Sequence, residues 1–193
     1  SPPAQTKGRR STVTHSEAMA AELRQLAETT MAEAWQFLEK GKAVPPSVTL
    51  LSGSPLTVQA VYTPASMNNK REKEAFIAYV QQAAENCGCS VAITTYDMRM
   101  AKPTTAAVEE LPPNILMLAF DLYSFDALVE MGLAEVVDCL MVSAQTRAGW
   151  IGMLARRYRC ENGVAEPVGP TEWTVGESGK EVFGPMMSVF PQP

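Results

Sequence analysis

The stretch VVDCLMVSAQTRAGWIGMLARRYRCENGVAEPV, residues 136–168, carries the clearest secondary-structure pattern in the chain. Two long apolar-rich runs flank Thr146-Arg147-Ala148-Gly149, and a third run begins after Glu161-Asn162-Gly163. Asn-Gly between two strands favours a type I′ turn, because both central residues of that turn take a positive φ. We therefore expect an antiparallel meander over this stretch.

Two helices, a hairpin and a strand are expected upstream of the meander. Apolar residues recur at three- and four-residue spacing over residues 14–40 and again before Gly88, as on one face of a helix. Between these helices, the runs Val48 to Leu51 and Leu56 to Tyr62 flank a Gly- and Pro-containing turn, which indicates a hairpin. β-branched and aromatic residues predict a strand from Ser90 to Met98.

Two shorter segments lie between this strand and the meander. The run Ile115 to Phe120 is continuously apolar, which we interpret as a strand buried on both faces. Ser124 can cap a brief helix that extends to Met131 and ends at Gly132. This order of elements predicts an α+β fold with two amphipathic helices packed on one face of a mainly antiparallel sheet ending in a β-meander.

The two ends of the chain differ in composition from its centre. Residues 1–13 are polar and basic, so we expect a flexible N-terminal arm. Residues 14–168 are expected to form a single α+β domain, because a chain of 193 residues suits one core better than two. Gly and Pro recur throughout residues 169–193, which favours an extended C-terminal strap.

Charge and hydropathy exclude two classes of partner. The net charge of −5 argues against general binding to nucleic acid, which clustered Lys and Arg drive. No apolar run approaches the roughly 18–20 residues needed to cross a bilayer, so no membrane association is expected. The first residues show no apolar signal core, and a cytoplasmic location is expected.

The four cysteines are Cys87, Cys89, Cys139 and Cys160. Four cysteines could form a disulfide framework or a zinc site, but a chain of this length and apolar content does not need disulfides to fold. One residue separates Cys87 from Cys89, whereas structural zinc sites use two to four. We expect free thiols in a reducing compartment and no bound metal.

The residue types needed for most catalytic sites are scarce. His15 is the only histidine and lies in the first turn of the first expected helix, which leaves no base for a Ser-His or Cys-His pair and no multi-histidine metal site. Neither the phosphate-binding P-loop nor the dinucleotide-binding glycine pattern occurs. We therefore expect no cofactor.

Carboxylates remain as candidate catalytic groups. Asp97 ends the expected strand from Ser90, and Asp121 follows the apolar run from Ile115. Two strand-end carboxylates that come together could bind a divalent cation or act as acid and base. The structural alternative is that Asp favours turns and strand ends without any function.

One basic cluster lies inside a folded segment, at Arg156-Arg157-Tyr158-Arg159. On a strand, Arg157 and Arg159 share one face, so they are candidates for binding an acidic partner. The alternative is a solvated edge strand, where basic residues prevent unwanted pairing.

Three segments together resemble a known group of proteins. A strand like Ser90 to Met98, a proline-bearing loop, a hairpin like Leu140 to Arg157 and a closing Gly169-Pro170-Thr171-Glu172-Trp173 resemble short uncharacterised proteins of bacteria and their phages. Those proteins have Glu and Trp where this chain has Tyr96 and Asp97. The resemblance implies this fold and a microbial origin, and it implies no activity.

Two functions are compatible with these patterns. The first is a non-enzymatic binding or accessory module that contacts a protein partner or a second copy of itself. The second is a small divalent-metal-dependent hydrolase or nuclease that uses Asp97 and Asp121. The absence of convergent catalytic residue types favours the binding module.

Overall fold

The structure is a computed structural model that describes residues 15–177 and 188–191. The expected N-terminal arm, residues 1–13, lies outside these ranges. In chain order the elements are α1 (His15–Glu39), β1 (Ser47–Ser52), β2 (Thr57–Tyr62), α2 (Lys70–Cys87), β3 (Val91–Pro103), α3 (Thr105–Glu110), α4 (Pro113–Leu122), α5 (Phe125–Glu130), β4 (Ala134–Thr146), β5 (Trp150–Glu161), β6 (Val164–Pro167) and β7 (Glu172–Glu177).

The strands form one antiparallel sheet in the order β2-β1-β3-β4-β5-β6. β7 pairs with β5 along Trp150–Ala155, on the edge that β6 occupies further along the same strand. Asn162 and Gly163, between β5 and β6, have φ angles of 53° and 78°, as the type I′ turn requires. The predicted α+β fold and its meander are confirmed.

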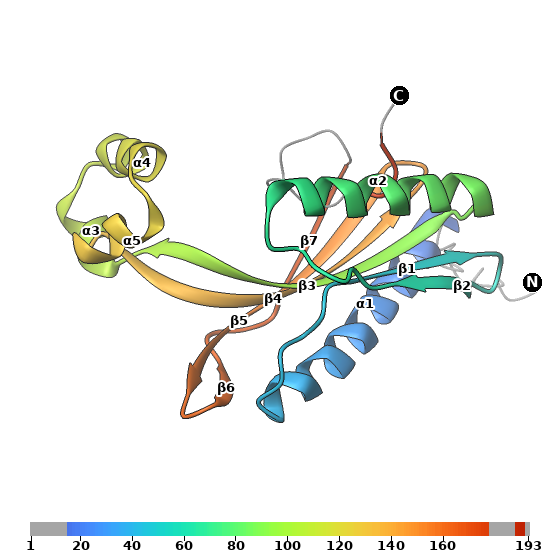
Figure 1. Ribbon diagram of the computed structural model, residues 1–193, viewed down its shortest axis with the longest axis horizontal. Coiled ribbons are helices and arrows are strands. Elements are labelled where there is room, and N and C mark those ends of the chain that lie inside the picture. The colour runs from blue at the N-terminus through green and yellow to red at the C-terminus, as the bar shows by residue number, and fades with distance from the viewer. Residues whose placement is uncertain (1–14, 178–187, 192–193) are drawn as a thin grey trace, which may run out of the picture.

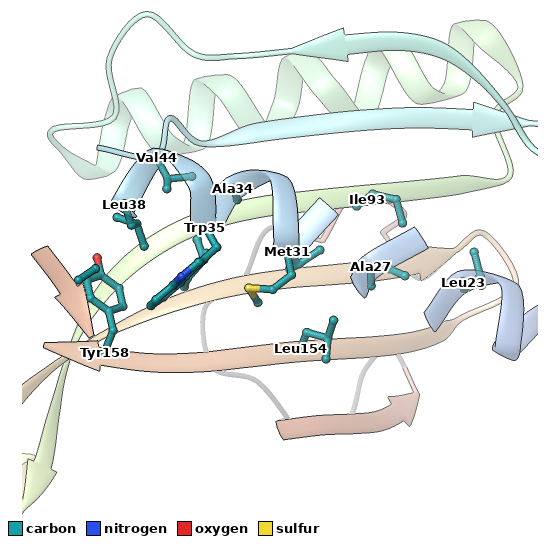
Figure 2. Packing of buried hydrophobic residues seen from close by; sticks show 14 of the residues in the cluster. Leu23, Ala27, Met31, Ala34, Trp35, Leu38, Val44, Ile93, Leu154 and Tyr158 are labelled. Carbon is teal, nitrogen blue, oxygen red and sulfur yellow. The ribbon is translucent and has the colours of Figure 1, made fainter. Parts of the chain in front are cut away.

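The two long helices lie on opposite faces of the sheet, with α2 above it and α1 below it in Figure 1. On the α1 face, Figure 2 shows the buried side chains of the helix lying over Ile93 of β3 and Leu154 of β5. On the other face, Val80 and Ala84 of α2 pack with Ala92 of β3. The prediction that both helices pack on one face is therefore wrong.

The sequence of the central strands explains this two-sided cover. Successive residues of a strand point to opposite faces, and Val91, Ala92 and Ile93 are all buried. The same holds for Leu140, Met141 and Val142 of β4, which face both sides in turn. Strands that carry buried apolar residues at successive positions need cover on both faces, so the second helix has to lie opposite the first.

The described parts of the expected C-terminal strap contact both faces. Trp173 of β7 packs against the α1-face core, whereas Val189 and Phe190 are buried on the α2 face. The Val189 amide donates to Oε1 of Gln145 at 3.0 Å, and Nε2 of Gln81 donates to the Ser188 carbonyl at 2.7 Å. Val189 and Phe190 are thus part of the core on the α2 face.

We predict that Phe190→Ala lowers the free energy of unfolding by about 3 kcal/mol, because the ring is 5% exposed and its removal leaves a cavity. Urea unfolding followed by circular dichroism measures this difference. Val175→Ala on β7, where the side chain is 51% exposed, is the control and should change stability by less than about 0.5 kcal/mol. Equal effects of the two substitutions would show that residues 188–191 do not contribute to the core.

β3 and β4 extend beyond the two-sided core as a paired ribbon. Their register runs without interruption from Val91 opposite Thr146 to Pro103 opposite Ala134. At the far end of this ribbon lie α3, α4 and α5, set apart from α1 and α2 (Figure 1). We call residues 104–133 the helical lobe, and we call α1, α2 and the part of the sheet that they cover the body.

The central helix of the helical lobe corrects a second prediction. Residues Ile115 to Phe120 belong to α4 and not to a strand, and none of the residues of α4 is buried. Pro112 occupies the N-cap position and Pro113 the first helical position, where a missing amide hydrogen costs nothing. Leu, Met and Ala then favour helix over strand, and a short apolar run alone does not distinguish the two.

The expected short helix after Ser124 is confirmed as α5. The Ser124 hydroxyl accepts from the Ala127 amide at 3.4 Å, and Gly132 follows the helix with a φ of 71°. Across the described residues, no helix has both the length and the apolar character needed to cross a bilayer.

Candidate functional site

Hydrogen bonds of Thr104 join the two ends of the helical lobe where it meets the ribbon. Thr104 donates through its amide to the Leu133 carbonyl at 3.0 Å and through its hydroxyl to the Gly132 carbonyl at 2.8 Å. The same hydroxyl oxygen accepts from the Ala107 amide at 3.2 Å and so caps α3. These bonds join the first and last residues of the lobe where it meets the ribbon.

The helical lobe concentrates exposed apolar side chains. Nine of the eighteen large apolar side chains that are exposed in the described residues lie in it, namely Val108, Ile115, Met117, Leu118, Leu122, Tyr123, Phe125, Val129 and Met131. Exposed fractions reach 68% at Met117 and 69% at Leu122. Single exposed apolar residues are normal on a protein surface, but a contiguous group of them marks an interaction site.

The exposed residues of α4 follow a regular spacing. Ile115, Leu118 and Leu122 recur at intervals of three and four, so they form one stripe along the helix. Leu116, Ala119 and Phe120 are half-buried and form a second stripe toward the rest of the lobe. The helix is therefore apolar on the side that packs and also on a side that faces solvent.

The helical lobe is also acidic. It contains five exposed carboxylates and no Lys, Arg or His, the carboxylates being Glu109, Glu110, Asp121, Asp126 and Glu130. The whole chain carries 21 acidic and 16 basic residues, so the entire net charge of −5 equals the charge of the lobe. Among the ion pairs between described residues, none includes a carboxylate of the lobe.

The candidate catalytic residue Asp97 lies within β3 and not at its end. One carboxylate oxygen accepts a hydrogen bond of 2.6 Å from the Tyr158 hydroxyl, and the other is buried without a partner. Burial raises the pKa of Asp97, the bond from Tyr158 opposes this rise, and the nearby charge of Asp138 adds to it. Tyr158 is itself held by an edge-to-face contact with Trp35, at 5.8 Å between ring centroids.

The second candidate, Asp121, does not meet Asp97. Asp121 is exposed on α4, in the helical lobe, and the strand from Asp97 to Pro103 alone spans about 20 Å. Within the described residues, no group of three or more His, Cys, Asp or Glu side chains is placed to hold a metal ion. The structure therefore separates the two carboxylates that the metal-dependent hypothesis needs to combine.

The raised pKa of Asp97 predicts a pH-dependent stability. Between the ordinary value of 3.8 and the raised folded value, the folded protein holds a proton that the unfolded chain has lost. Stability contributed by this group is therefore lost as the pH rises through that window. We predict that Asp97→Asn, which keeps an acceptor for Tyr158, removes this loss and makes the protein more stable than wild type at neutral pH.

Urea unfolding across the acidic to neutral range measures this effect. Asp121→Asn is the matched control, because its side chain is exposed, and should stay within about 0.5 kcal/mol of wild type. A wild-type pH profile in Asp97→Asn, with lower stability at neutral pH, would show that the ionised carboxylate stabilises the fold.

The binding candidates Arg157 and Arg159 already contact carboxylates of the same chain. Nη2 of Arg157 lies 3.7 Å from Oε2 of Glu172. Nη2 of Arg159 lies 3.1 Å from Oε2 of Glu135. Their strand, β5, is not an edge strand, since it pairs with β4 on one side and with β6 and β7 on the other. The edge-strand interpretation is wrong, and an acidic ligand at this site would compete with Glu172 and Glu135.

Two of the four cysteines form a disulfide, which corrects the prediction of free thiols. Cys87 and Cys89 flank Gly88, which ends α2 with a φ of 62°. This left-handed turn brings the two Cα atoms to 5.3 Å, within the range of about 4.4–6.8 Å that a disulfide bridges. Cys139 is free and buried, and Cys160 is free and exposed.

We predict that reduction of this disulfide lowers the free energy of unfolding by about 1.5 kcal/mol, because closing so short a loop removes little entropy from the unfolded chain. Urea unfolding with and without a phosphine reductant measures the difference. The Cys87→Ser/Cys89→Ser variant is the control and should not respond to reductant. Alkylation of Cys87 in the native, unreduced protein would contradict the disulfide.

A hollow of about 430 Å³ lies between the start of α1 and the β4–β5 turn. Met19, Val91 and Arg147 are among its lining residues. Arg147 is already bound to the Glu85 carboxylate at 2.7 Å and to the Ala84 carbonyl at 2.9 Å. The hollow therefore offers no uncommitted charged group to a ligand.

The sequence contained two signals for the helical lobe that our interpretation did not use. Pro112-Pro113 begins a helix at the apolar run, and the 30 residues from 104 to 133 hold no basic residue. The chain matches no protein-family model, no curated protein and no solved structure. The resemblance to short bacterial and phage proteins stays a prediction.

Proposed function

We propose that this protein is a non-enzymatic binding or accessory module that docks a partner through its helical lobe. The observation that carries the proposal is the exposure of α4, a ten-residue helix with no buried residue and with apolar side chains on its outer side. A cytoplasmic site of action belongs to the same proposal, and in a reducing cytoplasm Cys87 and Cys89 would be held as thiols.

The energetics of apolar surface support a docking role. An apolar side chain contributes about 1.5–3 kcal/mol when it is moved from water into a packed interior. Ile115, Leu118 and Leu122 make only part of this contribution in the isolated chain, because each is at least 45% exposed. A partner that covers this stripe would be stabilised by the burial of the apolar surface that the fold leaves exposed.

The structural setting of the helical lobe supports the same role. The ribbon of β3 and β4 holds the lobe away from α1 and α2 (Figure 1), so a partner can reach α4 without contacting the body. The caps at Thr104 and Ser124 stabilise the helices locally, without a large core beneath them. The lobe thus keeps its shape while it presents apolar side chains to solvent.

The hydrolase or nuclease alternative has less support. It needs Asp97 and Asp121 near one cation, and the two residues lie on the body and on the helical lobe. The Tyr158 ring packs against Trp35, and its hydroxyl donates to Asp97. Asp97 therefore has a structural role that requires no catalytic one. No single contact in the described residues favours the alternative over the binding module.

Site-specific photo-crosslinking tests the proposal. Benzoylphenylalanine replaces Leu118 on the helical lobe in one variant and Val61 on β2 in a control variant, positions that are 52% and 60% exposed. Both proteins are expressed in the organism that encodes the chain and irradiated in the cell. We expect a covalent adduct of defined mass from position 118 and none from position 61.

The mass of the adduct identifies what lies on the helical lobe. An adduct with another protein or with a second copy of this chain supports docking through the lobe. Equal adduct formation at both positions, or none at position 118, would refute it.

A further inference from the structure

We infer that the partner of the helical lobe is an α-helix whose apolar seam is flanked by Lys or Arg side chains. This inference rests on the proposed docking function and specifies the partner's chemistry. It follows from the spacing of the apolar residues on α4 and from the negative charge of the helical lobe that carries them.

The spacing of the exposed stripe matches a helical partner. Ile115, Leu118 and Leu122 follow the three- and four-residue alternation by which one helix packs along another. An extended peptide that binds by strand addition needs an open strand edge, and α4, which carries the stripe, has none. The stripe covers the length of a short helix of two to three turns, so the partner is expected to lay a similar length of helix along it.

The charges beside the stripe specify the flanks of the partner. Asp121 directly precedes Leu122 on α4, a position from which a side chain reaches the flank of a packed helix. Asp126 and Glu130 lie on α5, and Glu109 and Glu110 on α3. Basic side chains beside the partner seam would therefore face Asp121 and other carboxylates of the helical lobe, none of which has an ion pair within the described part of the chain.

The position of these acids within their helices adds to the argument. The last turns of α3, α4 and α5 contain acidic residues and no basic residue. These are Glu109 and Glu110 in α3, Asp121 in α4 and Glu130 in α5. Negative charge is unfavourable at a helix C-terminus, because the backbone carbonyls there already carry partial negative charge. A cationic partner would relieve this repulsion, and its binding would be weakened by salt.

Charge also disfavours the other occupants of an apolar surface. Two lobes in contact would place five carboxylates against five without a basic residue between them. An anionic bilayer would repel the same carboxylates, although it would accept the apolar stripe. A cationic helix alone satisfies both the apolar and the acidic character of the surface.

Fluorescence anisotropy with designed peptides tests this inference on the full chain. The probe is a labelled amphipathic helical peptide with a leucine seam and Lys flanks, and the reference is the same peptide with Glu flanks. We expect the Lys peptide to bind at least tenfold more tightly at moderate salt, and raising the salt to reduce this ratio.

Three variants locate the binding and its charge dependence. Leu118→Ser/Leu122→Ser should abolish binding of the Lys peptide, with the fold checked by circular dichroism. Asp121→Asn/Asp126→Asn/Glu130→Gln should reduce the preference for the Lys peptide to below threefold. Glu22→Gln/Glu33→Gln/Glu39→Gln on α1 changes the net charge equally and should keep the tenfold preference.

The outcomes separate this inference from the proposed function. Equal binding of both peptides, lost in Leu118→Ser/Leu122→Ser, would overturn the charge inference and leave docking through the helical lobe intact. Three other outcomes would also overturn the inference. They are binding that survives this double substitution, failure of both peptides to bind, and binding to anionic vesicles that is tighter than binding to the Lys peptide. The crosslink at position 118 decides the docking function independently of all these results.

Discussion

The uninterrupted pairing of β3 with β4 is the constraint on which the rest of the structure depends. The ladder runs from Val91 opposite Thr146 to Pro103 opposite Ala134. Its first half is buried between α1 and α2, and its second half holds the helical lobe away from the body (Figure 1). Because one ladder belongs to both parts, no loop separates the core that stabilises the chain from the surface that we propose as its docking site.

The two parts of the molecule use apolar residues in opposite ways. On α1, the spacing of Leu23, Ala27 and Met31 produces a face that is buried against the sheet. On α4, a similar spacing produces a stripe that remains exposed, since the ribbon takes it beyond the reach of either long helix. The same local pattern thus stabilises the fold in one place and is available to a partner in the other.

Polar side chains inside the sheet also have structural explanations. Gln145 binds the backbone of Val189 and donates to Ser143 at 3.2 Å, so a buried amide holds residues 188–191 on the α2 face. Asp97 accepts from Tyr158 where the α1-face core ends and the ribbon begins. Buried polar groups are tolerated when they are hydrogen-bonded, a condition that one oxygen of Asp97 meets and the other does not. These contacts join segments that are distant in sequence.

The sequence by itself determined the local elements of this protein. Periodicity identified α1 and α2, and Asn162-Gly163 identified the turn of the meander, because caps, turns and amphipathic spacing depend on neighbouring residues alone. Only the tertiary structure decided which face each long helix covers, that the helix from Pro113 to Leu122 stays exposed, and that Asp97 and Asp121 lie apart. These features depend on contacts between residues far apart in the chain, and the apolar character of a residue does not indicate whether the core or a partner will cover it.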